Sequence, residues 1–184
     1  MAIPDFTNDA VFPVFDALPV EDDAESAGPD ARPEWFLVAQ VKQNMTITKP
    51  TVVVSDRGGD EFAITFEDRG IDLRPVKTGW TIVVPRAVRT KPKEGKKGFV
   101  RVAEGKGTAV KYVPADLDKV VELGTRLRAD NDGAGQKCAS CGGGAEGTLK
   151  ACTGCGAVKY CGKVSFVSTP FAVCVCFVVR VRVV

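Results

Sequence analysis

Five cysteines near the end of the chain have the spacing of a metal site. Cys138 and Cys141 form one C-x2-C pair, Cys152 and Cys155 form a second, and Cys161 follows. Two cysteines at this spacing can share one tetrahedral Zn2+ through their thiolates. A redox C-x2-C would need a βαβ setting, which the surrounding sequence lacks. The sequence therefore predicts structural Zn2+ bound by Cys138, Cys141, Cys152, Cys155 and Cys161.

The number of zinc ions follows from the number of ligands. A closed structural site needs four ligands, so five thiols cannot close two sites. One zinc could take Cys138, Cys141 and Cys161 with Ser165 or water, or it could take the four cysteines of the two pairs. The second arrangement closes with thiolates alone, so we favour it if the spacer 142–151 can bend back. We expect about one zinc per chain.

Composition narrows the function classes. The chain has no histidine, which excludes Ser-His-Asp triads and HExxH zinc sites. All seven cysteines follow residue 137, a concentration that favours metal binding in a reducing compartment over a disulfide scaffold. The opening MAIPDFTNDA has neither a basic region nor an apolar run typical of a signal peptide. We expect an intracellular protein, nuclear or cytoplasmic, with no enzymatic role.

Charge is unevenly distributed along the chain. Residues 1–32 contain eight acidic residues and one arginine, a net charge of −7, and four prolines. We interpret them as a disordered acidic tail, with partner binding through its apolar residues as the alternative. Residues 33–137 carry 19 basic and 14 acidic residues, a net charge of +5.

Alternating apolar residues predict a mainly β domain over 33–128. The stretches WFLVAQV, TVVVSD, EFAITFE, WTIVVP, GFVRVA and TAVKYV read as strands, and RGGD between the second and third predicts a hairpin. The last two would pair through EGKG. Expected core residues are Leu37, Phe62, Ile64, Phe66, Ile82 and Val84. We predict a small OB-like β-barrel, or a sandwich, that folds as residues 33–130 without the cysteine-rich region.

A single helix and a linker should follow the strands. Apolar residues in PADLDKVVELGTRLR recur at a helical period, which predicts a helix that closes the β domain at residue 128. The glycine, asparagine and aspartate of residues 129–137 are typical of a linker.

A basic stretch within the β domain suggests a second function. Residues 86–111 contain nine basic and two acidic residues. If Val100 and Val102 face inward, Phe99 and Arg101 face outward, as in a site that stacks bases and contacts phosphates. This basic hairpin could instead be a solvated edge whose lysines prevent aggregation.

The stretch LKACTGCGAVKYC resembles the start of a MYND-type zinc finger, and with the upstream NMTIT and VVVSDRGGDEFAITFEDR the chain is similar to small fungal MYND-finger proteins. The resemblance implies a cross-braced finger with two zinc ions that docks proline-containing peptides. It assigns Cys138, Cys141 and Cys161 to the first zinc, and Cys152 and Cys155 to the second.

The match ends after residue 163. Ser165 stands where the resemblance requires the next ligand, and the later His and Cys are missing. Residues 164–184 form an apolar tail that we interpret as intron read-through, with a membrane anchor as the alternative. The finger over 138–163 is therefore partial, that is, truncated.

Two functions follow. The first is a zinc-binding protein-interaction module, impaired by loss of the second half of its finger. The alternative is single-stranded nucleic-acid binding through the basic hairpin.

Overall fold

The computed structural model describes residues 4–21, 34–93, 97–132, 137–138, 149–151 and 159–161. The chain divides into two compact units, one of residues Thr7–Leu117 and one of Met1–Phe6 with Asp118–Val184. The larger unit contains η1 (Phe15–Ala17), β1 (Phe36–Asn44), β2 (Thr51–Asp56), β3 (Glu61–Phe66), β4 (Thr81–Pro85), β5 (Val100–Val102), η2 (Gly107–Ala109) and β6 (Lys111–Val113). The smaller contains α2 (Leu117–Asp132), β7 (Lys150–Ala151) and β8 (Lys159–Tyr160).

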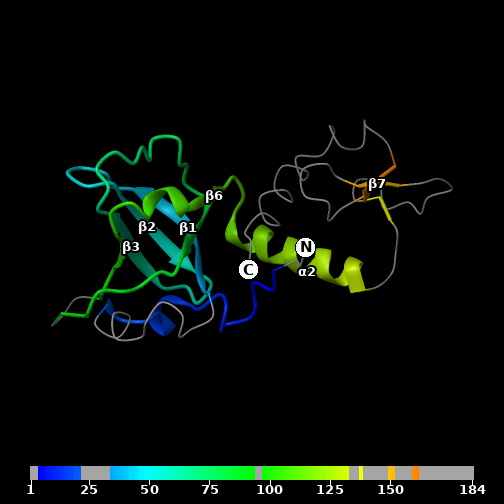
Figure 1. The fold of residues 1–184 in the computed structure, drawn as a ribbon, viewed down its shortest axis with the longest axis horizontal. Helices are drawn as coiled ribbons and strands as arrows, with labels where there is room; N and C mark the ends of the chain where they lie inside the picture. The colour runs from blue at the N-terminus through cyan, green and yellow to red at the C-terminus, as the bar shows by residue number, and fades with distance from the viewer. Residues whose placement is uncertain are drawn as a thin grey trace. The chain divides into compact units, whose positions relative to one another are not determined.

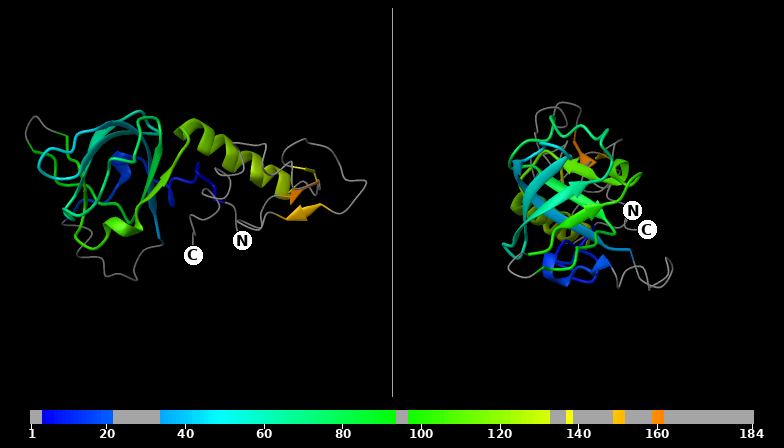
Figure 2. Two further views of the ribbon diagram at one scale, coloured as in Figure 1. Left: turned by 90° about the horizontal axis from the view of Figure 1, so that it is seen from above. Right: turned by 90° about the vertical axis from the view of Figure 1, so that its left-hand side faces the viewer.

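The larger unit is built on one six-stranded sheet that curls around its core (Figures 1 and 2). The strand order is β5-β3-β2-β1-β4-β6, in which β3 and β5 are parallel and the other neighbours are antiparallel. For the residues that the structure describes, this confirms a mainly β fold, with α2 as the α-helix among the elements given above. The topology is consistent with the expected OB-like barrel.

The hairpin of β2 and β3 forms as its alternating pattern predicts. Val52 pairs with Ile64 and Val54 with Phe62, and all four side chains are buried in the core. The turn between the strands contains Gly59 at φ +86°, a conformation that residues with a Cβ rarely adopt. Local sequence is therefore sufficient to specify this hairpin.

Strand β1 lies between β2 and β4 and pairs with both. It pairs with β4 over Phe36–Gln40 and with β2 over Ala39–Asn44. The register with β2 shifts between Val41 and Gln43, and an irregularity of this kind bends a strand and increases its twist. The bend allows the sheet to wrap around Leu37, Ala39 and Val41, which are fully buried.

The predicted pairing of the last two strands was wrong. Strand β5 pairs with β3 at one edge of the sheet, and β6 pairs with β4 at the other. The EGKG connection contains a turn, in which the Lys106 N–H donates to the Ala103 carbonyl at 3.0 Å, but η2 follows it directly and the two strands do not pair with each other. The Asp68 carboxylate accepts the Gly105 N–H at 3.0 and 2.9 Å. Sequence showed that both strands exist but not which neighbours they select.

The expectation of a disordered acidic tail was wrong for residues 4–21. Phe12, Phe15 and Leu18 are buried, and Phe15 stacks on Phe62 with ring centroids 4.2 Å apart. The Phe15 N–H donates to the buried Asp56 carboxylate at 2.6 Å. Burial of each large apolar side chain contributes about 1.5–3 kcal/mol, which offsets the cost of ordering a charged segment. Residues 1–3 and 22–33 lie outside the described residues.

Helix α2 groups with the smaller unit, not with the β domain as predicted, and it extends past residue 128 into the expected linker. Its apolar face buries Val120, Leu123 and Leu127. A Cβ on Gly124 would lie 2.7 Å from Phe6 Cδ2, so the glycine allows the N-terminal residues to pack closely. This close approach of Gly124 and Phe6 lies within one unit.

No helix in the described part of the chain has the length and apolar character needed to cross a bilayer. Residues 133–136 of the expected linker and the whole tail 164–184 lie outside the described residues. The read-through and membrane-anchor interpretations of that tail both stay predictions.

Candidate functional site

Two of the five predicted zinc ligands lie close together. Cys138 is buried, with 2% of its surface exposed, and Cys161 is exposed. The backbone N–H of Cys161 donates to the Sγ atom of Cys138 at 3.5 Å. The two residues are 23 positions apart, so this contact results from folding rather than local geometry.

A short hairpin precedes Cys161 and fixes its position. Lys150 pairs with Tyr160 and Ala151 with Lys159, so β7 and β8 form an antiparallel pair. Cys161 follows β8 directly, and Tyr160 beside it is buried. Cys141, Cys152 and Cys155 lie outside the described residues, and within the described residues no three potential metal ligands come together.

The contact between Cys138 and Cys161 bears on the two zinc arrangements. Zinc is bound by thiolates, and N–H donors directed at sulfur stabilise their negative charge. A site with Cys138, Cys141 and Cys161 brings the first and last of these residues together, as the described contact does. Cys138 is a ligand in both arrangements, and the choice between them stays a prediction.

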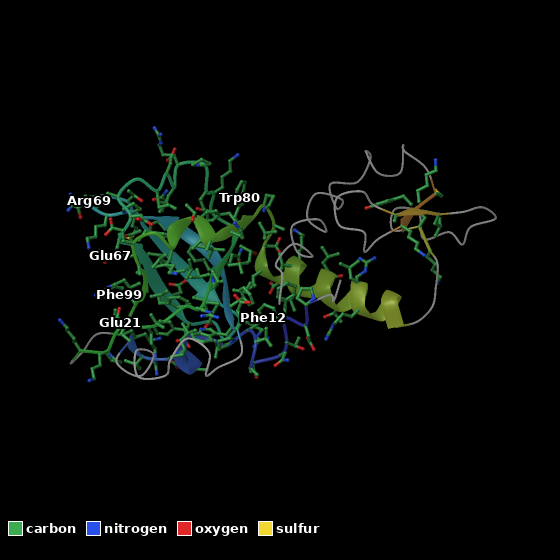
Figure 3. The ribbon with its side chains drawn as sticks, viewed as in Figure 1. Phe12, Glu21, Glu67, Arg69, Trp80 and Phe99 are labelled. Atoms are coloured by element: carbon green, nitrogen blue, oxygen red, sulfur yellow. The ribbon has the colours of Figure 1, made fainter. Side chains whose placement is uncertain are left out.

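The second candidate site is the outer side of the β3–β5 edge, which we call the Phe99 face and define by Thr65, Phe99 and Arg101. Val100 and Val102 are buried, and Phe99 and Arg101 point away from the core, as the alternation predicted. The Arg101 guanidinium carbon lies 5.6 Å from the centre of the Phe99 ring. Thr65 is the neighbour of Arg101 on β3. Figure 3 shows Phe99 with Glu21, Glu67 and Arg69 on the β3 side of the sheet.

A lysine-rich loop begins and ends beside this face. The Thr90 N–H donates to the Phe99 carbonyl at 2.8 Å, and the Phe99 N–H donates to Thr90 Oγ1 at 3.0 Å. Arg89 and Val100 form an adjacent antiparallel bridge. Lys91, Lys93 and Lys97 belong to this loop, and Lys96 lies outside the described residues. Hydrogen bonds therefore join the two ends of the loop at Thr90 and Phe99, whereas the basic hairpin predicted from GFVRVA and TAVKYV does not form.

Gly98 is required for this closure. A Cβ at Gly98 would lie 2.4 Å from the Thr90 carbonyl oxygen, a distance that ordinary Cβ atoms do not reach. The glycine therefore allows the two ends of the lysine-rich loop to approach each other. It also sets the position of Phe99, the next residue.

Carboxylates balance much of the positive charge at the Phe99 face. Glu67 accepts from Lys49 Nζ at 2.6 Å and lies 3.6 Å from Arg101 Nε. Glu21 lies 3.5 Å from Arg101 Nη1. The hydrogen bond from Lys49 lowers the pKa of Glu67, that is, it favours the ionised carboxylate. The face is a mixed network of charges rather than a uniformly basic surface.

Carboxylates also pair with the cations of the lysine-rich loop. Lys97 Nζ lies 2.6 Å from Asp60 Oδ1, and this contact raises the pKa of Lys97. Arg89 at the base of the loop lies 3.5 Å from Asp16. Sequence reasoning located the cations and Phe99 but not these carboxylates, since Asp16, Glu21 and Asp60 come from other parts of the chain. No local signal predicts such contacts.

Comparison with known proteins adds little. No protein-family model matches the chain, and no curated protein matches it. Among solved structures, it is similar to Schizosaccharomyces pombe Pot1pC bound to ssDNA, with 13% identity, a TM-score of 0.38, and coverage of 52% of this chain and 90% of the other. At this TM-score the likeness establishes neither a shared fold nor a shared function.

Proposed function

We propose that the chain is a zinc-dependent protein-interaction module. The observation that carries this is the hydrogen bond from Cys161 N–H to Cys138 Sγ, which joins the two ends of the predicted ligand set. The resemblance to MYND-type fingers supports docking of proline-containing peptides as its role. Zinc would link the region around Cys138 to the β7–β8 hairpin, and a complete structural site contributes about 10–16 kcal/mol of folding free energy.

Cobalt titration of the full chain tests this proposal. Cobalt in a thiolate site gives strong sulfur-to-metal absorption, which reports ligand type directly. Replacing Cys138 with serine should weaken this absorption and lower the zinc content measured by mass spectrometry below about one ion per chain. Cys174→Ser is the matched control because the predicted ligand set does not include Cys174. Equal absorption from the Cys138→Ser variant and the wild type would refute the proposal.

A second candidate function is single-stranded nucleic-acid binding at the Phe99 face. Its specific support is the outward pair of Phe99 and Arg101 next to the lysine-rich loop. The meander β1–β2–β3 with a parallel β5 favours an OB-like barrel, a fold that binds oligonucleotides on its β2–β3 face and neighbouring loops. Bases would stack on Phe99, and phosphates would contact the cations around it.

Titration of the full chain into a fluorescently labelled oligothymidylate tests this function. Loss of one stacking ring costs about 1–3 kcal/mol, so Phe99→Ala should weaken binding by about 5- to 150-fold. Ile47→Ala is the control, because Ile47 is an apolar side chain with 86% of its surface exposed, outside the Phe99 face. Affinity should also fall steeply as salt is added, because binding releases counterions. Identical affinities for the two variants would exclude the Phe99 face as the binding site.

A further inference from the structure

The acidic segment, residues 9–21, runs along the base of the lysine-rich loop. The Arg89 N–H donates to the Pro19 carbonyl at 2.9 Å, and the Glu21 N–H donates to the Arg89 carbonyl at 3.0 Å. Val20 and Arg89 form a parallel bridge. The backbone of the segment is therefore attached to the residue that precedes Thr90, where the loop begins.

The carboxylates of this segment contact cations of the larger unit. Asp16 lies 3.5 Å from Arg89, and Glu21 lies 3.5 Å from Arg101. Asp9 pairs with Arg57 in the same way. Arg101 is also the cation beside Phe99, so Glu21 occupies a position from which a phosphate would contact Arg101. Such a contact neutralises the cation, and a phosphate would have to replace the Glu21 carboxylate in order to contact Arg101.

The carboxylate in each of the pairs of Asp16 and Glu21 can be replaced by another anion. The Asp16 side chain is 71% exposed and that of Glu21 is 31% exposed. Their partners Arg89 and Arg101 are 22% and 43% exposed, so each pair is partly in contact with water. An exposed ion pair contributes about 0.2–1 kcal/mol, and salt screens it. The segment itself is held by the buried Phe15 and Leu18, which do not depend on those charges. A phosphate can therefore replace a carboxylate while the segment stays attached.

We propose that the acidic segment is an intramolecular competitor for polyanions at the Phe99 face. Asp16 and Glu21 lower the affinity of the face for single-stranded nucleic acid, so that only a strand presenting several phosphates together displaces both carboxylates. This inference rests on the second proposed function. It adds regulation of that site by residues far from it in the sequence.

The test compares charge-neutral variants of the full chain in the same oligothymidylate titration at low salt. Glu21→Gln and Asp16→Asn should each bind about two- to fivefold more tightly than the wild type, which corresponds to the strength of an exposed pair. The difference in affinity between these variants and the wild type should shrink at high salt, because salt also screens the ion pairs that the carboxylates form. Both substitutions lie at the surface, and thermal unfolding would verify that each variant stays folded.

Asp72→Asn is the matched control. It makes the same change in net charge and also removes a carboxylate from an exposed arginine pair, in this case with Arg74. If Glu21→Gln and Asp16→Asn bind no more tightly than Asp72→Asn, the competitor proposal is wrong and the binding function stands. If neither the wild type nor any variant binds, both are wrong. A gain confined to Glu21→Gln and Asp16→Asn supports both.

Discussion

Replacing Phe15 with alanine measures how far the N-terminal segment stabilises the β domain. The ring is 2% exposed, stacks on Phe62 at a centroid distance of 4.2 Å and an interplanar angle of 18°, and lies 5.9 Å from the Arg89 guanidinium carbon. Removing a buried phenylalanine side chain costs about 3–5 kcal/mol, from lost apolar burial and the cavity that remains. Because domains are stable by only about 5–15 kcal/mol, this loss is a large share of the total.

Urea unfolding followed by tryptophan fluorescence is the suitable assay. Both tryptophans, Trp35 and Trp80, belong to the larger unit, so the signal reports that unit alone. The midpoint should fall with little change in the slope, since the surface exposed on unfolding is nearly the same. Phe99→Ala is the control, because Phe99 faces outward and is only half-buried. If Phe15→Ala lowers the free energy of unfolding by no more than Phe99→Ala does, the segment does not complete the core.

A fragment of residues 33–130, which we expected to fold without the rest of the chain, lacks part of the core. That fragment lacks Phe15 and Leu18, both of which belong to the core of the larger unit. It also leaves the buried Asp56 carboxylate without the Phe15 N–H. A fragment that begins at residue 4 should therefore be more stable than one that begins at residue 33, as judged by their urea midpoints.

Three further predictions concern single side chains. Gly98→Ala should destabilise the larger unit by about 1–3 kcal/mol in urea unfolding, because the new Cβ meets the Thr90 carbonyl; an unchanged midpoint would contradict this. Lys49→Gln should raise the pKa of Glu67, whose lowered value comes mainly from the Lys49 hydrogen bond, as a side-chain NMR titration would show. Because the pKa of Glu67 is lowered in the folded protein, its pair with Lys49 stabilises the fold above the ordinary glutamate pKa. This stabilisation is lost as the pH falls through the pKa of Glu67 in the folded state. Burial raises the pKa of Tyr112 to about 12, so Tyr112→Phe should remove a late step in the ultraviolet titration, and a full late step in that variant would show the assignment to be wrong.

Local patterns were sufficient for part of this protein. The alternation in TVVVSD and EFAITFE, with a glycine-containing turn between them, was sufficient to predict a hairpin, and the residues of its second strand expected in the core, Phe62, Ile64 and Phe66, are buried. The same alternation placed Phe99 and Arg101 outward, because Val100 and Val102 had to face the core. The cysteine spacing predicts a zinc site that stays a prediction, and the structure brings two of its residues, Cys138 and Cys161, together.

Long-range choices were decided only by the tertiary structure. Disorder was predicted for residues 1–32 from their net charge of −7 and their four prolines, yet a few aromatic side chains that complete a core are enough to order residues 4–21. The neighbours of β5 and β6 were also not encoded locally, because a three-residue strand can pair with either edge that leaves its apolar side buried. The carboxylates at the Phe99 face come from remote segments for the same reason. Sequence determined which side chains each element presents, and the packing of distant elements determined which of those side chains meet.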